Sequence, residues 1–149
     1  MNAYTFRFDQ LLSIRGQEKS ELEITYKESV RSFEEAATTL YELLKKKEST
    51  IAEQEQQMQT GFSIVEIHRY ASFITGLEKS IDLYQQKVAA ARTKMKWNEE
   101  RLLEKSIEVK KYEKMKEKDQ KLFQDEQIRL EAIRLDEMNS VRFQSKEIG

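Results

Sequence analysis

One stretch decides the fold of this chain: TGFSIVEI at residues 60–67. Gly61 suits the left-handed conformation that ends a helix, since it has no Cβ to clash. Ser63 and Glu66 have the spacing of a capping box, in which each side chain bonds to the other residue's backbone amide. Phe62 and Ile67 fit a hydrophobic staple across the same helix start. The stretch therefore predicts a hairpin tip at residues 60–63.

After the tip, one phase of a seven-residue repeat runs from Ile67 to Ile133 in alternating steps of three and four residues. Such a seam winds two helices around each other in a left-handed coil. Its positions are Ile67, Tyr70, Ile74, Leu77, Ile81, Tyr84, Val88, Ala91, Met95, Asn98, Leu102, Lys105, Val109, Tyr112, Lys116, Asp119, Phe123, Glu126, Leu130 and Ile133.

Before the tip, a less regular apolar stripe predicts the partner helix. Two successive steps of four residues, from Leu22 to Val30, form a stutter that locally unwinds the coil. The consecutive apolar positions are Leu22, Tyr26, Val30, Phe33, Ala37, Leu40 and Leu44, and the stripe extends to Phe8 and Leu12 on one side and to Ile51 and Met58 on the other. Arg15, Lys19, Lys47 and Gln54 are polar interruptions in it.

The predicted fold is all-α: a long antiparallel two-helix coiled coil, with the second helix longer than the first. Helix one is expected at about residues 4–59 and helix two at about residues 64–145, in a single domain over residues 1–149. Folding back at Gly61 sets Leu44 near residue 78, Phe33 near Ala89 and Phe8 near Lys114. The last 25 or so residues of helix two are then left without a partner helix. The absence of proline allows such long helices.

Composition argues against most kinds of chemistry. The 26 basic and 27 acidic residues nearly cancel, so no net field recruits nucleic acid. There is no cysteine, His68 is the only histidine, and the glycines are too scattered for a phosphate-binding loop. We therefore expect no catalytic residue, no metal, no cofactor and no small-molecule substrate. The N-terminus lacks the apolar run of a signal peptide, and no stretch is apolar enough to span a bilayer, which predicts a cytoplasmic protein.

Apolar residues outside the seams indicate docking surfaces instead. Leu43 and Phe73 lie beside the predicted seams near the tip, where they form a docking patch or simply broaden the apolar stripe. The other end carries more apolar surface than two helices can bury together, which indicates a partner groove or, alternatively, fraying ends that self-associate weakly. That end includes Phe6, Phe8, Leu11, Leu12, Leu122, Phe123, Ile128, Leu130 and Ile133.

Several motifs together resemble the flagellar export protein FliJ family, over essentially the whole length. They are YTFRF at residues 4–8, LLSIR at 11–15, GFS at 61–63 and RYASFITGLEKSI at 69–81. The resemblance implies a non-enzymatic coiled-coil component of the flagellar type III export apparatus, which is peripherally associated with the cell membrane. It also implies three partners: the hexameric export ATPase, the cytoplasmic domain of the export gate, and export chaperones.

The resemblance assigns each partner a part of the chain. The ATPase receives the end formed by both termini, like the stalk of a rotary ATPase, which implicates the nine apolar residues listed above. The gate contacts the hairpin half, where Leu43, Phe73 and Leu77 match the family pattern, Tyr84 stands where another ring can occur, and Thr39, Lys46 and Thr50 depart from it. Two other roles stay open: an export chaperone or escort, and a purely structural, self-associating coiled coil.

Overall fold

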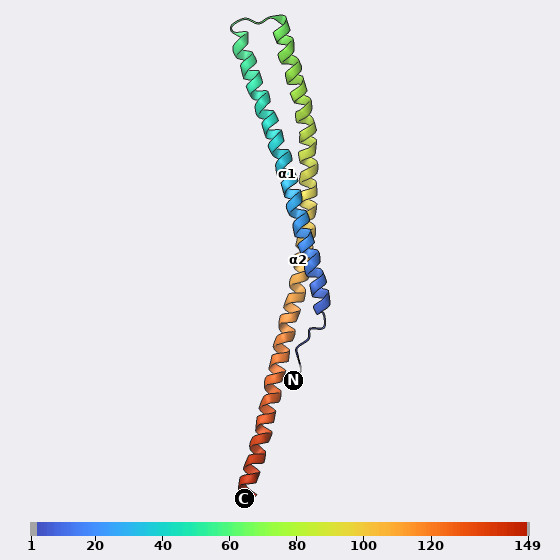
Figure 1. Ribbon diagram of the computed structural model, residues 1–149, viewed down its shortest axis with the longest axis vertical. Coiled ribbons are helices and arrows are strands. Elements are labelled where there is room, and N and C mark those ends of the chain that lie inside the picture. Colours follow the sequence, from blue (N-terminus) through green and yellow to red (C-terminus); the bar gives the residue numbers. More distant parts are fainter. Residues whose placement is uncertain (1–2, 149) are drawn as a thin grey trace. The chain divides into compact units, whose positions relative to one another are not determined.

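Two long helices dominate the computed structural model, which describes residues 3–148. Helix α1 is Asp9–Met58 and helix α2 is Ile64–Ile148 (Figure 1). The helices pack antiparallel, and α2 is the longer of the two. This arrangement confirms the predicted fold class. Helix α2 begins at Ile64, as predicted, and ends at Ile148, a few residues after the predicted end at about residue 145.

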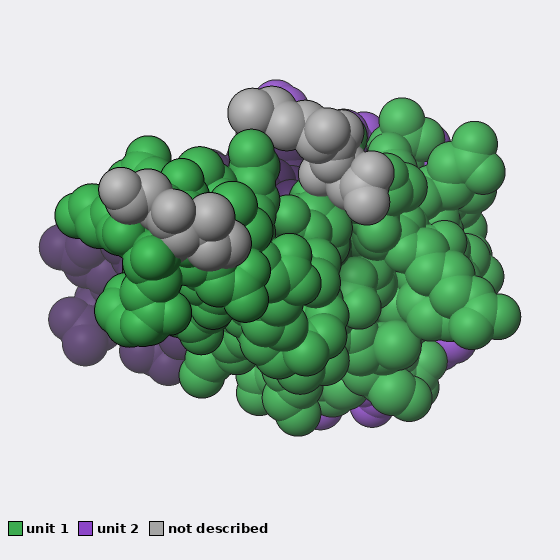
Figure 2. Space-filling view, turned by 90° about the horizontal axis from the view of Figure 1, so that it is seen from below, with its two compact units in different colours: residues 1–19, 104–149 green, residues 20–103 purple. Residues whose placement is uncertain are grey.

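The packing divides the chain into two compact units. Unit 1 joins Met1–Lys19 to Glu104–Gly149 (green in Figure 2), and unit 2 is Ser20–Leu103. In each unit a segment of α1 lies beside an antiparallel segment of α2 (Figure 1). The single domain expected over residues 1–149 stays a prediction.

The tip has the turn and the Ser63 cap that its sequence predicts, while the predicted staple of Phe62 on Ile67 stays a prediction and Ile67 is 37% exposed. Gly61 has a φ of 100°, in the left-handed region that side chains with a Cβ rarely adopt. The Glu66 amide donates to the Ser63 hydroxyl at 3.3 Å, as in a capping box. The Phe62 ring packs edge-on against Tyr70, with ring centroids 5.5 Å apart. These contacts hold the start of α2 against the turn.

The seam of α2 is confirmed over most of its length. In unit 2, every seam position from Tyr70 to Leu102 is buried or half-buried, and the residues between them are exposed except Ser80. In unit 1, the seam continues through the buried Val109 to Phe123, with only Asp119 exposed. Alternate steps of three and four residues therefore describe which side of α2 packs.

The predicted seam of α1 is partly wrong near the tip. Leu22 to Leu40 lie in the seam as predicted, but Leu44 is 39% exposed whereas Leu43 is half-buried. The seam then continues through Lys47, Thr50 and Gln54, whereas Met58 is exposed. Lys47, Ile51 and Gln54, which the predicted stripe includes, are half-buried, so the prediction is wrong at Leu44 and Met58 and misses Leu43 and Thr50. Thr50 is satisfied by donating to the Lys46 carbonyl at 2.7 Å, and Lys47 by pairing with Glu78 at 3.5 Å.

The start of α1 also differs from the prediction of about residue 4. Residues 4–8 are not helical, and we call this segment the N-terminal strap. Its aromatic residues alternate with polar ones, and the three rings turn inward while Thr5 and Arg7 stay exposed. Alternation of this kind suits an extended chain. Helical bonding begins at Phe8, whose carbonyl accepts from the Leu12 amide at 2.9 Å.

The predicted register is correct to within about one helical turn. In unit 2, Lys47 pairs with Glu78 and the Arg92 guanidinium lies 5.5 Å from the Phe33 ring centroid. In unit 1, the ring centroids of Phe8 and Tyr112 are 6.3 Å apart. The length of the tip and the two apolar stripes together fix this alignment.

Candidate protein-binding surfaces

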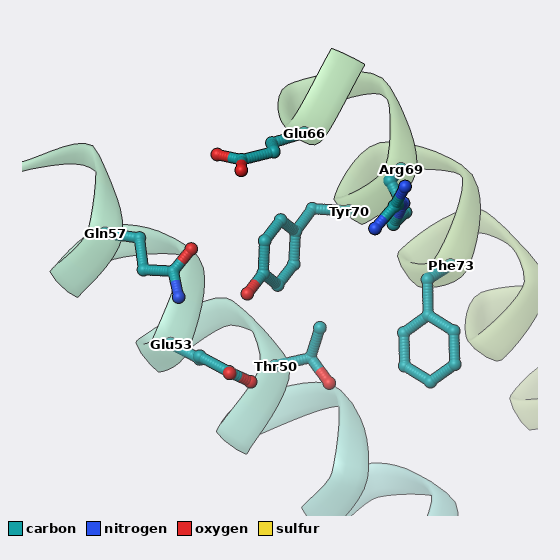
Figure 3. A pocket seen from close by; sticks show the side chains of 7 residues that line it. All are labelled: Thr50, Glu53, Gln57, Glu66, Arg69, Tyr70 and Phe73. Atoms are coloured by element: carbon teal, nitrogen blue, oxygen red, sulfur yellow. The ribbon is translucent and has the colours of Figure 1, made fainter. Parts of the chain in front are cut away.

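An open cleft of about 370 Å³ lies beside the tip in unit 2 (Figure 3). Three of its lining residues come from α1 and four from α2. They are Thr50, Glu53 and Gln57, and Glu66, Arg69, Tyr70 and Phe73. The seam of α1 is polar at this level, so no apolar side chain from α1 fills the space beside Tyr70. The cleft follows from that mismatch.

Tyr70 forms the centre of this cleft and points from α2 toward α1 (Figure 3). Loss of hydration raises the pKa of its hydroxyl above 10.0, and the charge of Glu53, a hydrogen bond to Glu53 and the charge of Glu66 add to the effect. The hydroxyl therefore stays protonated near neutral pH and can donate to Glu53. The cleft offers an aromatic wall and two carboxylates to a partner.

The four residues that the resemblance assigns to the gate differ in accessibility. Phe73 is 45% exposed and has the Lys46 ammonium 5.5 Å from its ring centroid. Leu43 and Tyr84 are half-buried, and Leu77 is only 8% exposed because it packs in the seam. Of these side chains, Phe73 presents the largest accessible apolar surface to a partner.

The nine apolar residues at the other end, all in unit 1, also divide into two groups. Phe6 is 6% exposed, and Phe8, Leu11, Leu12 and Phe123 are half-buried, so these five pack within the chain. The exposed group consists of Leu122 at 68%, Ile128 at 68%, Leu130 at 47% and Ile133 at 42%. Among these nine residues, the accessible ones all lie on α2.

In the C-terminal segment of α2, residues 124–147, every residue is exposed. It also presents other large apolar side chains, which the sequence pattern places in the same segment: Leu135, Met138, Val141 and Phe143. Glu126 and Arg129 pair along the helix, with the shortest contact at 2.6 Å, which adds only weak helix stability. A helix with so much exposed apolar surface is typical of a protein-binding segment.

Four charged side chains connect the helices of unit 1 where sequence predicted polar interruptions. Arg15 lies 2.9 Å from Glu108 and 2.8 Å from Glu18, and Lys105 lies 2.8 Å from Glu18 and 3.1 Å from Glu108. Hydrogen bonding to Lys105 and the charge of Arg15 lower the pKa of Glu18. Hydrogen bonds to both glutamates raise the pKa of Lys105. Mutual pairing explains how these charges are accommodated at the helix interface.

Within residues 3–148, no group of three or more histidine, cysteine or acidic side chains is arranged to hold a metal ion. His68 is exposed near the tip. Neither helix, over the part described, combines the length and apolar character needed to cross a membrane.

The chain is similar to known proteins over nearly its whole length. The family described as "Flagellar FliJ protein" matches residues 4–147. A relative from Bacillus subtilis (strain 168), named "Flagellar FliJ protein", is 38% identical over 141 residues, which cover 95% of this chain and 96% of the relative. No solved structure gives a significant match.

Proposed function

Because the chain belongs to the flagellar FliJ family, we propose that it is a non-enzymatic component of the flagellar type III export apparatus. In this role it joins two partners, the hexameric export ATPase and the cytoplasmic domain of the export gate. The observation that carries the proposal is the C-terminal segment of α2, which exposes apolar side chains along residues 124–147. The protein works in the cytoplasm, at the membrane-embedded apparatus.

The ATPase binds the end of the chain in unit 1. Leu122, Ile128, Leu130 and Ile133 contact it directly, because they are the accessible members of the predicted set. Phe6, Phe8, Leu11, Leu12 and Phe123 belong to the same end but pack within the chain. A helix has no rotational symmetry about its axis, so it contacts the subunits of a ring unequally. It then favours some nucleotide states over others through unequal affinity.

Truncation tests the ATPase role directly. Removing residues 124–149 is expected to abolish stimulation of the cognate export ATPase and to weaken binding at least about tenfold, because the exposed apolar surface is lost. Circular dichroism and sedimentation of the truncated chain check that the remaining hairpin is folded and monomeric. Undiminished binding by the truncated protein would refute the assignment of this end to the ATPase.

The gate binds unit 2, the part of the chain that contains the hairpin tip. Phe73 is the main contact, Leu43 and Tyr84 lie at the edge of the surface, and Leu77 supports Phe73 from within the seam. Phe73→Ala is expected to weaken binding of the gate's cytoplasmic domain by at least about tenfold, as loss of an aromatic anchor does. Trp97→Ala, at a ring that is 55% exposed, is the matched control and should bind normally. Equal loss in both variants would argue against a specific surface around Phe73.

Export chaperones are the third class of partner, and the alternative role is that of an escort for export substrates. An escort requires a broad apolar groove, whereas the cleft beside Tyr70 is lined mainly by polar side chains. The structure therefore gives less support to that role than to the link between ATPase and gate. Pull-down of substrates without the ATPase would favour the escort role, and a stable oligomer at low concentration would favour self-association.

A further inference from the structure

The N-terminal strap lies against the seam side of α2 in unit 1. The Tyr4 ring centroid is 5.4 Å from that of Phe123, and the Phe8 centroid is 6.3 Å from that of Tyr112. Between them Phe6 is 6% exposed. The strap therefore covers the face of α2 between Tyr112 and Phe123.

The covered face is continuous with an exposed one. Tyr112 and Phe123 belong to the same seven-residue repeat as Leu130 and Ile133, which are 47% and 42% exposed. No element of the described chain covers α2 beyond Phe123. A partner that packs along this side of α2 from the C-terminal direction meets the strap at Phe123.

The strap is held by side chains. The Tyr4 hydroxyl donates to Asp119 at 3.0 Å and lies 3.4 Å from the Lys116 carbonyl oxygen. Next to the strap, Asp9 pairs with Lys116 at 2.8 Å. An α-helix bonds its own backbone amides internally, so α2 has no row of backbone donors for pairing with an extended segment. Residues 4–8 can thus leave α2 without disrupting its helical hydrogen bonds.

We propose that the strap masks part of the ATPase-binding surface, and that the strap and the export ATPase compete for the face of α2 from Tyr112 to Phe123. This inference rests on the proposed function, because it assumes that the ATPase binds the exposed continuation of the same face. The apparent affinity for the ATPase is then the intrinsic affinity multiplied by the fraction of molecules in which the strap is open. The strap acts as an intramolecular competitor.

Two strap variants test the competition in the full-length protein. Phe6→Ala removes the most buried ring, and Tyr4→Phe removes only the hydroxyl that bonds to Asp119. Both are expected to bind the cognate export ATPase more tightly, Phe6→Ala by about fivefold or more, because they raise the open fraction. Thr5→Ala changes an exposed residue of the same strap and should leave affinity unchanged. Fluorescence anisotropy of labelled protein titrated with the ATPase measures all three variants.

Unchanged affinity in Phe6→Ala and Tyr4→Phe would overturn the proposal, since the strap would then be a fixed part of the hairpin. Weaker binding would also overturn it, because it would mean that Phe6 and Tyr4 contact the ATPase themselves. If wild-type protein fails to bind the ATPase, the proposed function fails. Hydrogen exchange of the protein alone still tests the strap in that case: the Asp9 amide, which donates to the Phe6 carbonyl at 3.2 Å, should exchange through local opening, faster in Phe6→Ala. Exchange of this amide only through global unfolding would refute an opening strap.

Discussion

Asn98 is the most informative residue for the stability of the coiled coil. Asn98 is 2% exposed in the α2 seam, and its Nδ2 has no hydrogen-bond partner among residues 3–148. A buried donor without a partner costs about 1–3 kcal/mol. Natural coiled coils tolerate one asparagine in the seam because it disfavours other registers and oligomers, although it lowers stability. We therefore expect Asn98→Leu to stabilise the fold.

The magnitude follows from three contributions. Removing the unpaired donor gains about 1–3 kcal/mol, and burying a leucine side chain gains about 1.5–3 kcal/mol. Fitting the extra volume into a packed seam costs about 1–3 kcal/mol. The net expectation is about 1–3 kcal/mol of added stability, which raises Tm by about 3–10 °C. Urea and thermal denaturation, followed by circular dichroism at the helix band, measure the change.

Gln85→Leu is the matched control for Asn98→Leu, because Gln85 is exposed on the same helix. It should alter stability by less than about 0.5 kcal/mol. Sedimentation of both variants at several concentrations is needed, since Asn98→Leu also removes a feature that disfavours oligomers. A monomeric Asn98→Leu variant with unchanged or lower stability would refute the reasoning about the buried donor.

Three further perturbations test other parts of the fold. Gly61→Ala should destabilise the chain by about 1–2 kcal/mol because φ is 100° there, whereas Gly76→Ala, in an open position on α2, should stabilise it by up to about 1 kcal/mol; thermal denaturation distinguishes the signs. Leu77→Ala should cost about 2–3 kcal/mol by urea denaturation, since its side chain is 8% exposed. The lowered pKa of Glu18 means that its ion pairs stabilise the fold above its ordinary pKa of 4.5 and lose their effect as pH falls through the lowered value. Glu18→Gln should therefore reduce the loss of stability on acidification, measured as the urea midpoint against pH.

Each of these perturbations has a contradictory outcome. Equal effects of Gly61→Ala and Gly76→Ala would mean that the backbone at the tip is not strained by a Cβ. A Leu77→Ala variant as stable as the wild type would show that the seam is loosely packed at that level. An acid profile that Glu18→Gln leaves unchanged would show that other carboxylates dominate the pH dependence.

The sequence was sufficient to predict the helical hairpin and its register. Long-range order in a coiled coil repeats every seven residues, so errors at single positions do not accumulate, and Gly61 and Ser63 fix where the chain reverses. The long segment of α2 without a partner helix follows from the unequal helix lengths. These features depend on periodicity and on local backbone chemistry, which sequence records directly.

The details that were missed depend on three-dimensional packing. Leu43 and Leu44 are adjacent leucines that both precede Lys47 at seam spacing, and the burial of Thr50 accompanies that of Leu43. The sequence predicts helix from about residue 4 because residues 4–8 contain no proline or glycine to forbid it. The alternation of its three rings with polar residues was the available signal. The cleft beside Tyr70 arises from what α1 lacks opposite that ring, and a pattern search along one helix does not detect such a mismatch.

Site-specific photo-crosslinking tests most directly whether the two ends serve two partners. A photoreactive amino acid is introduced at Ile128 in one variant and at Phe73 in another, and both are exposed to the export ATPase together with the gate's cytoplasmic domain. We expect the probe at Ile128 to crosslink to the ATPase and the probe at Phe73 to crosslink to the gate. Crosslinks to the ATPase from Phe73, with none from Ile128, would contradict the account.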